Sequence, residues 1–151
     1  MKKILLVRFT IILFMISLVA ACSSKKEYTT PESVVKANIQ YLNEKDIDNV
    51  MSTIHPQNPD FELVKENITK LLNRYDLNYK LLDTKILEQN DNEVKIRFTQ
   101  EVKKIKGPDF KDNITTGVHT LRKDEDSWRI YSTDMMKVES LSQDEAKNSS
   151  N

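Results

Sequence analysis

The residue types that most often catalyse reactions or bind metals are sparse in this chain of 151 residues. It contains one cysteine, Cys22, and two histidines, His55 and His119, which lie far apart in the sequence. A metal site usually takes several cysteine or histidine ligands at short spacing, a pattern that these residues do not provide. The only glycines, Gly107 and Gly117, are too few for a phosphate-binding loop. We therefore predict no metal, no cofactor, and a structural or surface role for each histidine.

Aspartates and tyrosines offer a second kind of chemistry, general acid–base catalysis. An enzyme would need a buried aspartate with a raised pKa beside a tyrosine hydroxyl that stabilises developing charge. The candidates are Asp46, Asp48 and Asp134 among the acids and Tyr41, Tyr75, Tyr79 and Tyr131 among the donors. Helix capping by the first two aspartates and core packing of the tyrosines explain the same residues without catalysis. We favour the non-catalytic interpretation and keep the enzyme as the alternative.

The segment before Cys22 has the order of a signal peptide. Lys2, Lys3 and Arg8 form a basic start, and an apolar run of 12 residues follows, from Thr10 to Ala21. As a helix this run would be about 18 Å long, which is short of the roughly 30 Å hydrocarbon core of a bilayer. It is therefore a poor permanent membrane span and a good signal-peptide core.

The stretch Leu18-Val19-Ala20-Ala21-Cys22 resembles the lipobox of bacterial lipoprotein precursors, although the usual box has leucine where this chain has Val19. The resemblance implies a lipoprotein signal peptide over residues 1–21, cleavage before Cys22 and lipidation of the Cys22 sulfur. It places the protein in the cell envelope, lipid-anchored on the extracytoplasmic side of a membrane. Which membrane stays open, and an ordinary secretory signal with an incidental cysteine is the alternative.

Charge argues against nucleic acid as a partner. The whole chain carries 23 basic and 23 acidic residues. Loss of the signal peptide would remove three basic residues and leave a net charge of about −3, which repels phosphate backbones. The lysines of the run 103–106 could contact an anionic polymer, but protection of an edge strand is the favoured interpretation.

The remainder divides into three parts. Residues 22–29 are predicted to be the lipidated cysteine and a polar tether, residues 30–141 one folded domain, and residues 142–151 a disordered tail. Within the domain, Thr30 and Pro31 form a helix start, and apolar residues at helical spacing then predict a helix. A second short helix is predicted from Ile47 to Ile54, and a third from about Asp60 to Tyr75.

The second half of the domain alternates with the period of two that is typical of strands. Four strands are predicted, over residues 77–87, 94–103, 114–123 and 128–132, with continuation of the fourth through Met136 and Val138 left open, and Leu81-Leu82 marks a predicted bulge in the first. Short turns between them indicate an antiparallel meander. The fold class is therefore α+β, with N-terminal helices packed on a curved antiparallel sheet of four or more strands. The predicted shared core contains Phe61, Ile68, Leu71, Ile96, Phe98 and Trp128.

This order of elements is similar to the nuclear transport factor 2-like superfamily, which has a cone-like, cystatin-like fold. The similarity rests on two opening helices, a third helix before the strands, and a tryptophan after an acidic turn in KDEDSWRIYS. One departure is that no short strand is evident between the second and third helices. The resemblance implies a pocket at the open end of the cone, which we expect near Tyr75 and Tyr79, between the third helix and the sheet.

These observations predict a membrane-anchored lipoprotein that acts as a non-catalytic accessory module. The expected partners are the membrane, through the lipid, and an unidentified small apolar ligand or envelope protein. The alternative function, implied by enzymes that resemble this fold, is a pocket isomerase, dehydratase or hydrolase with an aspartate and a tyrosine in its site.

Overall fold

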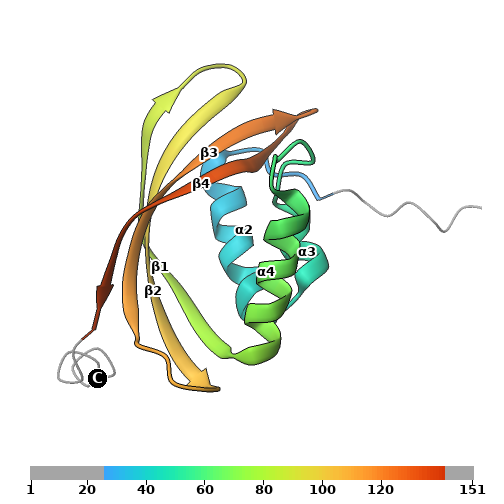
Figure 1. The fold of residues 1–151 in the computed structure, drawn as a ribbon. Coiled ribbons are helices and arrows are strands. Elements are labelled where there is room, and N and C mark those ends of the chain that lie inside the picture. Colours follow the sequence, from blue (N-terminus) through green and yellow to red (C-terminus); the bar gives the residue numbers. More distant parts are fainter. Residues whose placement is uncertain (1–25, 142–151) are drawn as a thin grey trace, which may run out of the picture.

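The structure, a computed structural model, describes residues 26–141. The predicted signal peptide, Cys22 and the predicted tail lie outside the described residues. Three helices come first, α2 (Pro31–Glu44), α3 (Ile47–Ser52) and α4 (Phe61–Arg74). Four strands follow, β1 (Asp76–Gln89), β2 (Glu93–Lys106), β3 (Asn113–Asp124) and β4 (Ser127–Ser140). The strands form one curved sheet and the helices cover one side of it (Figure 1). The predicted α+β, cone-like fold is confirmed.

The helix starts follow the capping signals in the sequence. Thr30 is the N-cap of α2 and forms a capping box with Ser33, and Pro31 occupies the first turn. Asp46 caps α3, because its carboxylate accepts a hydrogen bond from the Asn49 N–H at 3.0 Å. Lys45, between these helices, adopts a left-handed conformation that reverses the chain.

The sheet is an antiparallel meander in the order β1-β2-β3-β4. The β1–β2 turn is tightened by Asn90, whose side-chain oxygen accepts hydrogen bonds from the N–H groups of Asn92 and Glu93. The predicted bulge is confirmed, since the pairing of β1 with β2 passes from Leu81 to Asp83 and omits Leu82. The alternation of β2 is confirmed as well: Val94, Ile96, Phe98 and Val102 are buried.

The short strand that this fold often has between the second and third helices is present here only as a single β-bridge. Ile54 forms an isolated parallel bridge with Ile130 of β4. The Ile130 N–H donates to the Thr53 carbonyl at 2.8 Å, and the His55 N–H donates to the Ile130 carbonyl at 2.9 Å. A single bridge leaves too little alternation to be recognised in a sequence.

The apolar residues form two clusters between the helices and the sheet. Ile96, Phe98 and Trp128 are buried in the larger cluster, and Phe61 and Ile68 pack against it, as predicted. Leu71 was predicted in the same core, but it packs against the smaller cluster of Ile39, Leu77, Tyr79 and Val102. Its position in the last turn of α4, close to where β1 begins, explains the difference.

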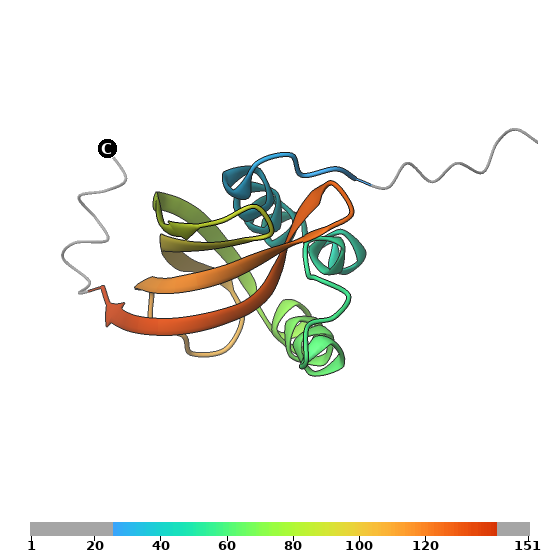
Figure 2. The same cartoon turned by 90° about the horizontal axis from the view of Figure 1, so that it is seen from above.

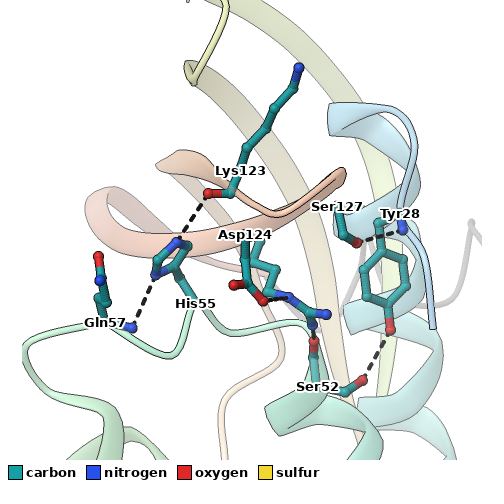
Figure 3. A network of polar contacts seen from close by, with 8 residues as sticks. Tyr28, Ser52, His55, Gln57, Lys123, Asp124 and Ser127 are labelled. Carbon is teal, nitrogen blue, oxygen red and sulfur yellow. Dashed lines mark hydrogen bonds and ion pairs between the residues drawn. The ribbon is translucent and has the colours of Figure 1, made fainter. Parts of the chain in front are cut away.

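The folded unit begins before Thr30, which corrects the predicted tether of residues 22–29. Tyr28 is only 5% exposed and belongs to the larger cluster. Its N–H donates to the Ser127 hydroxyl at 2.8 Å, and its carbonyl accepts from the Trp128 N–H at 2.9 Å. The Tyr28 hydroxyl lies 3.1 Å from that of Ser52 (Figure 3). The residues around Tyr28 have too little apolar periodicity to predict this docking.

A buried arginine of the β3–β4 hairpin ties the hairpin to α3. The Arg129 side chain is 6% exposed, and its Nε donates to an Asp124 carboxylate oxygen at 2.9 Å. Its Nη1 donates to the Ser52 carbonyl. A buried charge is tolerated only with such partners, so these contacts hold α3 and the hairpin together. The N-terminal segment lies beside the hairpin tip in both ribbon views (Figures 1 and 2).

Candidate functional site

An open cleft of about 320 Å³ lies between the helices and the inner face of the sheet. Its walls come from α2, α4, the bridge at Ile54 and all four strands, so no short motif could reveal it. The lining residues are Asn38, Leu42, Ile54, Val64, Asn67, Ile68, Leu71, Tyr79, Phe98, Gln100, His119, Ile130, Thr133 and Met135. The position agrees with the predicted pocket between the third helix and the sheet.

The lining of the cleft is apolar with a few uncharged polar groups. The helix side contributes Val64, Ile68 and Leu71, and the polar groups are two asparagines, a glutamine, a threonine, a histidine and the hydroxyl of Tyr79. None of the described lining residues is an aspartate, glutamate, lysine or arginine. Ligand sites commonly combine apolar walls with a small number of polar groups that fix orientation.

His119 is held in a neutral state inside this lining. Its ring stacks on Phe98 with centroids 4.2 Å apart, and its Nδ1 lies 2.8 Å from the Thr133 hydroxyl. Burial lowers the pKa of His119 from 6.5 to about 3, because the charged form loses its hydration. The prediction of a structural role is incomplete, since the same residue also lines the cleft.

Gly117 makes the stacking of Phe98 and His119 possible. A Cβ atom at position 117 would lie 2.8 Å from two carbons of the Phe98 ring and 2.9 Å from the Asp134 carbonyl oxygen. Since real Cβ atoms do not approach other atoms so closely, only glycine lets the ring lie flat across β3. Gly117 therefore positions the aromatic floor of the cleft.

The two tyrosines predicted near the pocket have different environments. Tyr79 lines the cleft, and burial raises the pKa of its hydroxyl to about 12. The Asn43 side chain holds its backbone, donating to the Tyr79 carbonyl at 2.8 Å and accepting from its N–H at 2.7 Å. Tyr75 lies outside the lining and packs against Phe110, with ring centroids 5.7 Å apart.

The aspartates of the enzyme alternative are not brought into the cleft. Asp46 caps α3, and the hydrogen bonds from the Asn49 backbone and then its side chain lower the pKa of its carboxyl group. Asp48 and Asp134 are exposed and do not line the cleft. An acid–base pair needs a raised aspartate pKa next to a donor, and the described residues of the cleft supply no carboxylate.

The other two candidate tyrosines and His55 lie elsewhere. Tyr41 accepts a hydrogen bond from the Lys26 ammonium group at 2.8 Å. Tyr131 lies under the Arg122 guanidinium, 3.6 Å from the ring centroid, and meets the His55 ring edge-on at 5.7 Å. The Nδ1 of His55 accepts a hydrogen bond from the Gln57 N–H at 3.0 Å, beside the β3–β4 hairpin (Figure 3).

Residues 26–141 also bear on two further classes of site, metal centres and membrane-spanning helices. No group of three or more histidine, cysteine, aspartate or glutamate side chains there is placed to hold a metal ion. Within the same range, no helix is long and apolar enough to cross a membrane.

Comparison with known proteins gives a family and a fold. The family model described as the C-terminal domain of anti-sigma-I factor RsgI9 matches residues 33–141. No curated protein sequence matches the chain significantly.

Solved structures match at low sequence identity and so inform the fold alone. A candidate scytalone dehydratase from Novosphingobium aromaticivorans DSM 12444 is 10% identical, with a TM-score of 0.61 over 74% of this chain and 85% of that one. A cystatin-like protein of unknown function from Nostoc punctiforme PCC 73102 is 12% identical, with a TM-score of 0.59 over 73% and 93%. The benzoate 1,2-dioxygenase beta subunit of Burkholderia mallei ATCC 23344 is 7% identical, with a TM-score of 0.58 over 69% and 85%. The nuclear transport factor 2-like, cystatin-like fold is thereby confirmed.

Proposed function

This chain belongs to the family of the C-terminal domain of anti-sigma-I factor RsgI9, and on that premise we propose that it is a non-catalytic binding module at the extracytoplasmic surface of a bacterial membrane. The family is described as a domain of an anti-sigma factor, and that description names no reaction. The proposed binding site is the cleft between α4 and the sheet. Its occupant is a small, uncharged molecule with an apolar body and at least one hydrogen-bonding group.

The observation that carries this proposal is the absence of charge among the described residues of the cleft lining. A charged ligand would lose hydration on entering and would find no opposite charge there. The pKa of His119, at about 3, keeps the imidazole neutral over the ordinary pH range. Gln100, His119 and Thr133 provide the polar contacts, while Val64 and Ile68 provide apolar surface.

The pocket enzyme has less support than the binding module. Its chemistry requires an aspartate beside a tyrosine, and Tyr79 lines the cleft with no aspartate among the described lining residues. Burial also raises the pKa of the Tyr79 hydroxyl to about 12, so that group stays protonated. We therefore propose binding without turnover.

A pair of matched dyes tests the charge preference of the cleft. N-phenyl-1-naphthylamine is uncharged, and 1-anilinonaphthalene-8-sulfonate is the same anilinonaphthalene skeleton with a sulfonate. We expect the neutral dye to bind at least about tenfold more tightly, because the sulfonate would be buried without a cation. Fluorescence titration of the purified protein gives both dissociation constants. Tighter binding of the sulfonate would contradict the proposed ligand class.

Two neighbouring residues of α4 locate the dye. Val64 lines the cleft, whereas Leu63 is 54% exposed. Val64→Trp should fill the cleft and weaken binding of the neutral dye about tenfold, while Leu63→Trp should leave it unchanged. An unfolding curve for each variant separates loss of binding from loss of folding. Equal weakening by both variants would place the dye outside the cleft.

Membrane anchoring is proposed to occur through a lipid on Cys22. Its support is the ordered basic, apolar and small-residue pattern that ends at this cysteine. More than one acyl chain is needed for a stable anchor, since each buried methylene contributes about 0.8 kcal/mol. The five residues between Cys22 and Tyr28 span at most about 20 Å, so the domain would stay close to the bilayer.

Metabolic labelling tests the anchor. Cells grown with a palmitate analogue should label the wild-type protein, and Cys22→Ala should abolish labelling and release the protein from membranes. Equal labelling of both proteins would refute lipidation at Cys22 and leave the cleft proposal untouched.

A further inference from the structure

The two outer strands of the sheet differ in how their free edges are protected. At β1, the Asn43 side chain binds both backbone groups of Tyr79. Bulges at Leu82 and Leu87 interrupt the rest of β1, and bulges at Tyr131 and Met136 interrupt β4, so irregular pairing does not distinguish the two edges. The Asn43 contact distinguishes them, because it occupies part of the β1 edge and has no counterpart beyond Ile130 on β4 within residues 26–141.

The β4 edge is closed only at its beginning. The segment from Thr53 to His55 pairs with Ile130 through two backbone hydrogen bonds. Beyond that point, from Tyr131 to Ser140, no segment within residues 26–141 pairs with the outer side of β4. Figure 2 shows this half of β4 running along the border of the sheet, away from the helices.

The open stretch is rich in exposed apolar side chains. Met135 is 62% exposed, Met136 66% and Val138 62%. Natural edge strands often carry charges that prevent association, whereas the charges of Tyr131–Ser140 are of both signs, Asp134, Lys137 and Glu139, and a second copy of the strand can pair them. Methionine adapts well to binding surfaces because its side chain is flexible and polarizable.

We propose that β4 pairs antiparallel with β4 of a second copy of this chain, through the stretch Tyr131–Ser140. A twofold axis makes such an interface self-complementary, since each contact occurs twice. Two edge strands joined in this way would form one continuous sheet of two domains.

Geometry and charge select the same register. The open stretch is bounded by the Ile54 bridge at one end and the end of β4 at the other, so its centre lies between Met135 and Met136. An axis at that point places Asp134 of each copy opposite Lys137 of the other. Asp134 and Lys137 lie on the same face of the sheet, because they pair with Val118 and Thr116 of β3.

The pairing also brings apolar side chains of the two copies together. The two methionines of each copy meet at the axis, and Thr133 lies opposite Val138 of the second copy. Met136 is an extra residue in the pairing with β3, which bends β4 locally at the axis. Lys137 already contacts Glu139 at 2.7 Å on the exposed surface, and Asp134 of the second copy would join this pair.

Charge reversal provides the test. The full chain, extracted from bacterial membranes in a nonionic detergent, is studied by sedimentation as wild type, Asp134→Lys, Lys137→Asp and the double variant. Each single variant places like charges opposite each other twice and should weaken dimerisation about tenfold. The double variant restores opposite charges and should dimerise like the wild type. Two chains that merely share a detergent micelle would sediment together in all four proteins, so they would not show the loss in the single variants and the recovery in the double variant.

Other outcomes overturn the proposal. A monomeric wild type, or four proteins that sediment alike, would exclude this interface. If the mass of the complex does not match two copies of this chain and requires a second protein, the β4 edge binds that protein and not a second copy. Arg97→Glu, on the outer face of β2, serves as the control and should leave the dimer intact; its dissociation would place the contact on the sheet face instead.

Discussion

The two halves of β4 have similar apolar content and opposite environments. From Ser127 to Ile130 every residue is buried, whereas from Thr133 to Ser140 every residue is exposed. Trp128 and Ile130 in the first half are matched by Met135 and Val138 in the second. Burial is therefore decided by what lies across the strand: the first half is covered by Tyr28 and Ile54, and the second by no described segment.

The cleft lies where these two halves meet. Ile130, Thr133 and Met135 line it in succession, from the buried core to the exposed rim. The anchored half gives the cleft a rigid wall, and the exposed half leaves its mouth open. Binding sites often combine a fixed scaffold with such an accessible edge.

The largest expected effect comes from truncating the buried half. Trp128→Ala removes a side chain that is 5% exposed and should lower the free energy of unfolding by about 3–5 kcal/mol. Val138→Ala in the exposed half should change it by less than about 0.5 kcal/mol. Chemical denaturation of both variants measures the difference. Losses of similar size would contradict the contrast between the two halves.

A smaller effect tests the boundary between the halves, where His119 binds Thr133. The pKa of His119 falls from 6.5 to about 3 on folding, so between these values the unfolded chain binds a proton that the folded chain excludes. Stability should therefore be lost as the pH falls through this window, by about 2–3 kcal/mol between pH 7.5 and 4.5. His119→Gln should remove this dependence. Denaturation curves at several pH values give the free energy of unfolding of both proteins. If this free energy falls equally as the pH falls in the wild type and in His119→Gln, His119 is not buried as described.

The fold was largely predictable from the sequence because its signals are local. Thr30 and Pro31 marked a helix start, and the alternation from Val94 to Phe98 marked a strand with one buried face. The bulge at Leu82 could also be anticipated, since two adjacent leucines break the alternation. Each of these signals depends on neighbours along the chain.

The site was only partly predictable because its residues meet through tertiary contacts. Tyr79 was expected near the pocket and lines it, but Tyr75, four positions earlier, turns toward Phe110. The role of His119 depends on Phe98 and on the missing Cβ of Gly117. These two residues lie on β2 and β3 and pair with each other across the sheet. No spacing within one segment could indicate this arrangement.

Native mass spectrometry of the protein purified from its bacterial host tests the central proposal most directly. The proposed function predicts that wild-type protein retains an uncharged small molecule, which organic solvent releases for identification, and that Val64→Trp retains much less of it while Leu63→Trp retains as much as the wild type. A retained molecule with a full charge, or equal retention by Val64→Trp and wild type, would contradict the assignment of the cleft as a site for neutral ligands.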